Sequence, residues 1–285
     1  MKKFLAAAFA VVMALSVMTG CSSSSENTTT ENEETTAEGE SASSERTQLI
    51  VGFDAEYPPY GYMAEDGSYV GFDLDLAQEV CNRNGWELVK QPIDWNSKDM
   101  ELNSGTIDCI WNGFTMTGRE DEYTFSEPYV DNSIVFVVMN DSDIQTEADL
   151  AGKVVVTQAD SSALAALTNT EDNDENLALA ASFAALEQVA DYNTAFMELE
   201  SGVVDAIAVD IGVAQYQLTS RGDTFRQLEE PLSTEQYAIA FKLGNTELRD
   251  QVQATLDEML EDGTFDEIVA NYSDYNLDKM VCLGK

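Results

Sequence analysis

The sequence has no histidine and few basic residues: 14 lysines and arginines stand against 53 aspartates and glutamates, a formal net charge of −39. The absence of histidine excludes Ser-His-Asp and Cys-His nucleophile arrangements and every histidine-ligated metal site. An acidic surface of this kind repels nucleic acid and anionic lipid, so neither is an expected partner. We interpret most of the acids as solubilising surface groups, and we expect no cofactor and no metal.

Cysteine is also scarce. Beyond Cys21 the chain has Cys81, Cys109 and Cys282, an odd number without Cys-x-x-Cys spacing, so a metal or redox motif is not indicated. Cys81 falls on the apolar side of a predicted helix and Cys109 in a predicted strand, where small buried hydrophobic residues are the default interpretation. One disulfide among the three is the alternative.

Long apolar runs are absent except from Phe4 to Met18, behind Lys2 and Lys3. A membrane-spanning helix needs roughly 20 apolar residues, more than this run offers, so residues 1–20 are predicted to be a cleaved export signal. The end of the run, Met18-Thr19-Gly20-Cys21, resembles a lipoprotein signal, which implies that Cys21 is lipid-modified; an ordinary signal peptide with an incidental cysteine is the alternative. Residues 21–46 are rich in Ser, Thr and Glu and are predicted to form a disordered tether.

Strand and helix signals alternate after this tether. The periodicities predict strands at 48–53, 86–93, 107–114, 133–139, 154–157, 186–189, 204–209 and 236–241. They predict helices at 73–84, 99–103, after Ser162, and at 191–200, 211–218 and 245–260. The acidic stretch 168–176 is predicted to be an exposed loop. The alternation favours mostly parallel sheets with helices on both faces.

Several motifs in one order carry a family resemblance. They are GFDAEYPPY at 52–60, VGFDLDL at 70–76, NGFTMTGR at 112–119, FSEPY at 125–129, VTQADSS at 156–162, DAIAVD at 205–210, QYAIAF at 236–241 and LEDGTFDEI at 260–268. Together they resemble the polar amino-acid-binding proteins of bacterial ABC importers.

The resemblance implies an α/β, two-lobed fold of the type II periplasmic-binding-protein class, in which each lobe is a mostly parallel sheet flanked by helices. Lobe 1 is predicted at 47–132 and 233–285, and lobe 2 at 133–232. Two strands are expected to cross between the lobes, near 129–133 and 231–235.

A free amino acid between the lobes needs partners for both of its charges, because burying either charge unpaired costs several kcal/mol. For the carboxylate, the resemblance implies the Arg119 guanidinium, the Thr115 hydroxyl and backbone N–H groups from Gly113 onward. Ser161 and Ser162 are expected to add donors from the second lobe, at a helix start that favours an anion. Asn112, which opens the same motif as Arg119, completes this group of predicted ligand-binding residues.

Arg119 departs from the family pattern. The family places its arginine three residues after the second threonine of the motif, and Arg119 lies two after Thr117. The shorter loop predicts a displaced guanidinium, and an exposed ion pair is the alternative role.

For the ammonium, the expected partner is Asp210 at the end of a predicted strand; capping of the helix at Ile211 is its alternative role. Tyr57 and Trp95 are expected to stack on the ligand side chain, or else to pack in a core. Asp54 either reaches a basic or amide tip or shapes the turn into Tyr57. Asp160, where the family often has glycine, adds an acid and favours a cationic or amide-bearing ligand.

These groups lie on both predicted lobes, so binding is expected to favour a closed form. The implied function is an extracytoplasmic, non-enzymatic, monomeric binding protein that touches the membrane through its lipid anchor and delivers a free amino acid to an ABC permease. A ligand-sensing lipoprotein is the first alternative. An enzyme on the same fold, such as a dehydratase, would need a placed general acid or base.

Overall fold

The computed structural model describes residues 46–169 and 174–285. The predicted export signal (1–20), the lipidation residue Cys21 and the predicted tether up to residue 45 lie outside them. Among the described residues, none of the helices combines the length and apolar character that a bilayer span requires.

The first sheet has the strand order β5-β1-β6-β14-β7. Its strands are β1 (Gln48–Phe53), β5 (Glu87–Pro92), β6 (Cys109–Ile110), β7 (Tyr123–Phe125) and β14 (Ala240–Lys242). The helices that accompany it are α1 (Phe72–Asn84), α2 (Lys98–Ser104), α7 (Thr246–Asp262), α8 (Thr264–Ala270) and α9 (Leu277–Met280), with a 3₁₀ turn at Trp95–Ser97. A small sheet adds β2 (Glu56–Tyr57), β3 (Gly61–Met63) and β4 (Tyr69–Val70). We call this assembly lobe 1.

The second sheet has the order β10-β9-β11-β8-β12. Its strands are β8 (Val130–Met139), β9 (Val154–Gln158), β10 (Ala185–Val189), β11 (Ala206–Asp210) and β12 (Phe225–Gln227). The helices around it are α3 (Ser162–Thr168), α4 (Asp174–Ser182), α5 (Tyr192–Ser201) and α6 (Ile211–Arg221). We call this assembly lobe 2.

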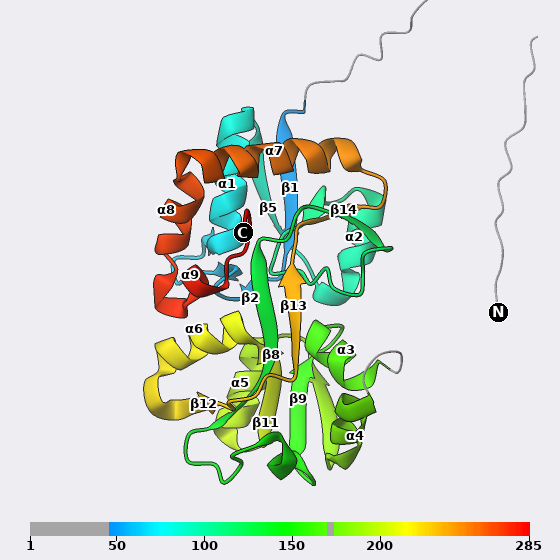
Figure 1. Cartoon of the computed structure of the whole chain (residues 1–285), viewed down its shortest axis with the longest axis vertical. Coiled ribbons are helices and arrows are strands. Elements are labelled where there is room, and N and C mark those ends of the chain that lie inside the picture. The colour runs from blue at the N-terminus through cyan, green and yellow to red at the C-terminus, as the bar shows by residue number, and fades with distance from the viewer. Residues whose placement is uncertain (1–45, 170–173) are drawn as a thin grey trace, which may run out of the picture. The chain divides into compact units, whose positions relative to one another are not determined.

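Two antiparallel strands connect the lobes. The first part of β8 pairs with β13 (Ser233–Tyr237), from Val130 opposite Tyr237 to Ile134 opposite Ser233. The rest of β8 belongs to the lobe 2 sheet, while the chain after β13 returns to lobe 1 through β14. Figure 1 shows β8 and β13 side by side between the two sheets. The predicted lobe limits, 132/133 and 232/233, fall at this pair of strands, and the division of the chain at these residues stays a prediction.

The predicted two-lobed α/β architecture is confirmed, but both sheets are mixed instead of mostly parallel. In lobe 1, β1 pairs parallel with β5 and β6, whereas β14 runs antiparallel to β6 and β7. In lobe 2, β9 pairs parallel with β10 and β11, whereas β8 runs antiparallel to β11 and β12. The antiparallel pairs arise because the chain passes twice between the lobes, which the βα alternation within each half does not reveal.

Three local predictions were wrong. The strand predicted at 107–114 pairs only at Cys109–Ile110, and the strand predicted at 236–241 is two strands. Between these two strands, the backbone of 238 and 239 bonds Phe114 and Ser126 instead of continuing one ladder. The predicted acidic loop at 168–176 ends in α4, whose first turn contains Asp174 and Glu175. Acids in a first turn stabilise a helix through its dipole, so this acidic cluster marks a helix start as well as a solvated surface.

Buried apolar side chains from both lobes form the core. Cys81 lies on the buried face of α1 and Cys109 in β6, both fully buried, as predicted for small hydrophobic residues. Within the described residues, Cys81, Cys109 and Cys282 are free thiols, so the alternative of a disulfide among them is not realised in this structure.

Candidate functional site

A small cavity lies where the two lobes meet, and we call it the inner cavity. Eight of the ten predicted ligand-binding residues line it, together with Gln158, which the sequence did not indicate. They are Tyr57, Trp95, Gly113, Thr115, Arg119, Ser161, Ser162 and Asp210. Asp54 and Asn112 lie outside this lining.

The lobes are in direct contact around the cavity. The Gln158 amide of lobe 2 donates a hydrogen bond of 2.6 Å to Asp54 of lobe 1. Asn193 of α5 bonds Glu56 of β2. The structure is therefore a closed arrangement of the two lobes.

Asp210 ends β11 and is 2% exposed. Its Oδ1 accepts a 2.5 Å hydrogen bond from the Tyr237 hydroxyl and a 2.8 Å bond from the Asn132 amide. Asp210 stands at the N-cap position of α6, yet its side chain makes no capping hydrogen bond, so the cleft and not the helix uses the carboxylate. Burial raises the pKa of Asp210 above its ordinary value, and the hydrogen bonds from tyrosine and asparagine oppose that rise.

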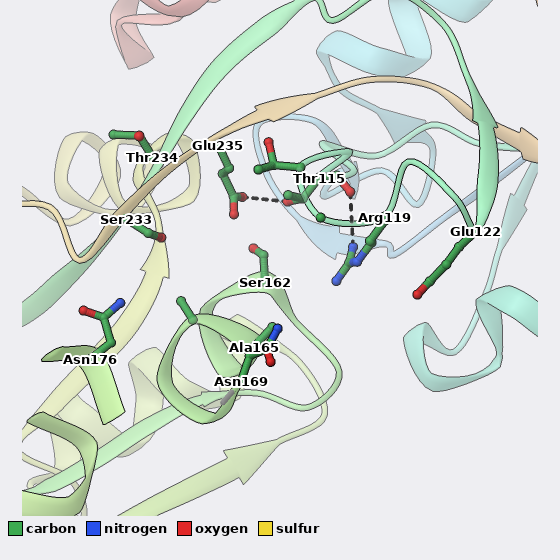
Figure 2. A pocket seen from close by; sticks show the side chains of 13 residues that line it. Thr115, Arg119, Glu122, Ser162, Ala165, Asn169, Asn176, Ser233, Thr234 and Glu235 are labelled. Atoms are coloured by element: carbon green, nitrogen blue, oxygen red, sulfur yellow. Dashed lines mark hydrogen bonds between the residues drawn. The ribbon is translucent and has the colours of Figure 1, made fainter. Parts of the chain in front are cut away.

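Glu235 is a second carboxylate of this region that sequence reasoning missed. Its Oε1 accepts hydrogen bonds from Thr115 Oγ1 at 2.6 Å and from Asn132 Nδ2 at 2.8 Å. Figure 2 shows the Glu235 carboxylate between Thr115 and Ser162. Burial, and then the neighbouring charge of Asp210, raise the pKa of Glu235. We call Asp210, Glu235, Asn132 and Tyr237 the acidic wall.

Arg119 reaches the cavity despite its shorter loop. Its guanidinium carbon lies 4.9 Å from the centroid of the Phe114 ring, and Nη1 approaches the Thr115 carbonyl oxygen at 3.4 Å. Among the ion pairs of the described residues, Arg119 takes part in none. The alternative of an exposed ion pair is therefore not realised, and the guanidinium fork is free to meet an anion.

Trp95 lines the cavity, is partly buried, and also packs edge-on against the Phe114 ring of the lobe 1 core, so both of its expected roles remain open. Its indole Nε1 donates to the Asp160 backbone carbonyl across the lobes at 3.2 Å, and Lys98 Nζ lies 5.2 Å from the centroid of the ring. Asp160 lies between the lobes, but its carboxylate pairs with Lys98 and does not line the inner cavity, so the expected preference for a cationic or amide-bearing ligand stays a prediction. Asp160 has φ +57°, a left-handed conformation that suits the glycine often found there in the family.

Asp54 shapes the turn and joins the lobes. Its Oδ1 accepts from the Glu56 backbone N–H at 2.8 Å, and its Oδ2 accepts from Gln158. Burial raises the pKa of Asp54 to about 6. Asn112 lies behind it, fully buried, with Oδ1 accepting from the Asp54 backbone N–H at 3.0 Å. Asp54 and Asn112, both predicted to contact the ligand, thus form hydrogen bonds with other protein groups next to the cavity.

The expected backbone donor of Gly113 is engaged as well. Its N–H donates to the Asp73 carboxylate at 2.6 Å, and Tyr129 donates to the same oxygen at 2.9 Å. Gly113 has φ +55°, and a Cβ there would lie 2.9 Å from the Tyr237 ring, so only glycine fits this close approach. Asp73, which the sequence analysis placed in a motif and at the start of a predicted helix, is therefore the residue that holds this loop.

The two serines differ. Ser161 caps α3 by accepting from Leu164 N at 3.1 Å, and its hydroxyl donates to the Gln158 carbonyl at 2.7 Å. Ser162 follows as the first residue of α3, lines both cavities, and Figure 2 shows its hydroxyl directed toward the Glu235 carboxylate. Ser162 is thus the serine placed to meet a ligand.

Two of the missed residues of the acidic wall could have been found from strand alternation. Glu235 and Tyr237 are two residues apart on a strand, so both side chains point to the same face. Asn132 lies directly opposite Glu235 in the β8–β13 register. The alternation at 235 and 237 is visible in the sequence, whereas the pairing with Asn132 requires the register of distant strands.

Comparisons with known proteins agree with this architecture. The profile of bacterial extracellular solute-binding proteins, family 3, matches residues 49–275. The chain is 33% identical to the L-cystine-binding protein TcyA of Bacillus subtilis over 94% of this chain and 96% of that protein. It is 31% identical to the L-cystine-binding protein TcyJ of Escherichia coli, over 77% and 80%. A substrate-binding protein of an ABC uptake transporter from Streptococcus pneumoniae, solved with bound histidine, superposes with a TM-score of 0.74 at 33% identity, over 79% of this chain and 92% of that one. The chain therefore belongs to the bacterial extracellular solute-binding proteins of family 3.

Proposed function

We propose that this protein binds a free amino acid in the inner cavity and delivers it to the permease of an ABC importer. One observation carries the proposal: the cavity has a buried carboxylate, Asp210, at one side and an unpaired guanidinium, Arg119, at the other. These are the partners that the ammonium and carboxylate of an amino acid require. The relatives named above support it, since they bind cystine or histidine.

The placement of these groups gives a mechanism for closure. Asp210 comes from lobe 2 and Arg119 from lobe 1, so neither lobe alone neutralises both charges of the ligand. A ligand that contacts both lobes has a higher affinity for the closed form and shifts the population toward it. Micromolar binding corresponds to about −8 kcal/mol, which two charge-assisted contacts and a stacked side chain can supply.

We further propose that the protein acts outside the cytoplasmic membrane, held there by a lipid on Cys21, as a monomer without enzymatic activity. The family supports the extracellular location. Labelling of the full-length chain with a fatty acid in cells, against Cys21→Ser, tests the anchor; equal labelling of both would reject it.

The amino-acid proposal is tested by calorimetric titration of the purified full-length chain with the twenty amino acids, cystine and ornithine. At least one should bind with micromolar affinity or better, and the bound compound should be recovered unchanged. Asp210→Asn should weaken binding by roughly 100-fold or more without lowering the unfolding temperature of the unliganded protein. Binding by no amino acid, or full binding by this variant, would reject the proposal.

A further inference from the structure

The cleft carries more negative than positive charge. A larger cavity, which we call the side pocket, adjoins the inner cavity, and Thr115, Arg119 and Ser162 line both. The charged residues lining the side pocket are Arg119, Glu122 and Glu235. Counting Asp210, the two cavities bring three carboxylates to one guanidinium. A zwitterionic ligand with no net charge leaves this excess unchanged.

The two buried carboxylates have only neutral donors. The single amide nitrogen of Asn132 donates to Asp210 and to Glu235, each at 2.8 Å. No ion pair among the described residues includes either acid. Two neighbouring carboxylates without a cation cannot both ionise without a large cost, so the pair lacks a positive partner.

A buried acceptor beside the pair also lacks a donor. Asn132 is 2% exposed, and its Oδ1 has no hydrogen-bond partner in the structure. Asn132 and Glu235 line a recess that shares Thr117, Thr234 and Glu235 with the side pocket. An ammonium or guanidinium group offers several N–H donors and no acceptor, which is the chemistry this recess is missing.

The two carboxylates face different spaces. Asp210 lines the inner cavity and not the side pocket, whereas Glu235 lines the side pocket and not the inner cavity. Figure 2 shows Glu235, Ser162 and Arg119 around the side pocket. One ammonium in the inner cavity therefore meets Asp210 and leaves Glu235 without a cation.

We propose that Glu235 binds a second cationic group of the ligand, which extends past the shared residues Thr115, Ser162 and Arg119 while the α-ammonium stays at Asp210. This inference rests on the proposed function and specifies its substrate class. The ligand is an amino acid with two cationic groups. Dibasic amino acids have this chemistry and also bring a net positive charge that offsets the excess of carboxylates. A disulfide-linked amino-acid dimer supplies the second ammonium as well, but together with a second carboxylate.

The test compares pairs of amino acids that differ in the second cation, in the wild-type full-length chain and in Glu235→Gln. The pairs are ornithine with norvaline, arginine with citrulline, and cystine with S-methylcysteine. The wild type should bind the two-cation member of at least one pair 10-fold or more tightly than its partner. Glu235→Gln should remove that preference while the affinity for the neutral partner stays within 3-fold. Which pair responds distinguishes a dibasic side chain from a dimer.

Glu230→Gln is the matched control, because Glu230 is an exposed acid on the segment that leads into β13 and lines neither cavity. It should leave every affinity unchanged. If Glu235→Gln weakens both members of a pair equally, Glu235 serves the α-ammonium and the inference is overturned, although the proposed function stands. An unchanged preference in Glu235→Gln also overturns it. Binding of no amino acid by the wild type would instead reject the proposed function.

Discussion

The two sides of the cleft are built in different ways. The acidic wall comes from strands β8, β11 and β13, and Asp210, Asn132 and Tyr237 in it are buried and joined by hydrogen bonds. Arg119 stands on the loop between β6 and β7, is only partly buried, and is held by a ring contact and one 3.4 Å hydrogen bond. The carboxylates are therefore fixed before a ligand arrives, whereas the guanidinium is free to adjust.

This difference predicts which of the two ligand charges depends more on its protein partner, as measured by the affinity lost on substitution. Removing the charge of a preorganised buried group causes the larger loss of binding affinity, because the surrounding groups cannot relax to replace it. A side chain on a loop can be replaced with smaller loss, since neighbouring backbone or water can take over part of its role. Ammonium recognition should therefore tolerate substitution less than carboxylate recognition.

The largest effect should come from Asp210→Asn compared with Arg119→Lys. Truncating one partner of a buried charged pair costs about 3 to 5 kcal/mol, so Asp210→Asn should lower amino-acid affinity by roughly 100-fold or more. Arg119→Lys keeps the charge but loses the planar fork, and we expect a loss of about 10-fold. Calorimetric titration at pH 7 measures both. If the lysine variant binds less tightly than the asparagine variant, the ranking of the two sides is wrong.

Sequence periodicity located most of the elements in both lobes. Strand β1 has the predicted limits 48–53, and α1 begins one residue before the predicted start at 73 and ends at 84 as predicted. Both elements have a periodic pattern of buried apolar residues, and this pattern can be seen within the segment itself. The division at 238–239 was not predictable in the same way, because it depends on hydrogen bonds to residues 114 and 126 of other segments.

The site residues show the same difference between local and long-range information. Residues within recognisable motifs, such as Thr115, Arg119 and Asp210, line the inner cavity, and their contacts with a ligand stay a prediction. Glu235 was missed because its hydrogen-bond partners, Asn132 and Thr115, are 103 and 120 residues away in the sequence, and no local pattern predicts such a long-range contact. The hydrogen bond from the Gly113 backbone N–H, a predicted ligand donor, to Asp73 is also long-range and could not be predicted from a local pattern.

Closure should be sensitive to Gly212, two residues after Asp210 on α6. A Cβ at this position would lie 2.4 Å from the Tyr60 hydroxyl oxygen of lobe 1 and 2.8 Å from its ring. Overpacking of this kind costs about 1 to 3 kcal/mol in the closed form, so Gly212→Ala should weaken amino-acid binding roughly 5- to 100-fold. The open form avoids the clash, so the unfolding temperature without ligand should hardly change.

Small-angle scattering with saturating ligand provides the second measurement for Gly212→Ala, which should remain more open than the wild type. Adding Tyr60→Phe removes the shortest of these contacts and should restore part of the affinity. A wild-type affinity in Gly212→Ala would mean that the acidic wall and lobe 1 need not approach as closely as the structure shows.

A pH effect on stability should arise at Asp73, which holds the Gly113 end of the Arg119 loop. Burial raises the pKa of Asp73 from 3.8 to about 7, so between these values the folded chain keeps a proton that the unfolded chain releases. The stabilising contribution is complete below pH 4 and is lost as pH rises toward 7, with a slope of up to about 1.4 kcal/mol per pH unit. Asp73→Asn should flatten this part of the profile.

Urea unfolding of the wild type and Asp73→Asn at pH 5, 6 and 7 measures the slope. Asp54 and Glu235 also have raised pKa values and contribute in the same direction, so a smaller slope should persist in the variant. A variant with the slope of the wild type would show that Asp73 is ionised in the folded protein throughout this range.

The smallest effect is expected at Tyr60, and it contrasts with that of the neighbouring Tyr237, whose ring centroid lies 5.3 Å away. The Tyr60 hydroxyl is buried without a hydrogen-bond partner, whereas the Tyr237 hydroxyl donates to Asp210 in the acidic wall. Tyr60→Phe removes an unsatisfied group and should change the free energy of unfolding by less than about 1 kcal/mol, toward greater stability. Tyr237→Phe removes a bond to a charged acceptor and should cost about 1.5 to 3 kcal/mol, with weaker amino-acid binding. Urea unfolding at pH 7 measures both, and equal losses in the two variants would show that the Tyr60 hydroxyl has a partner of its own.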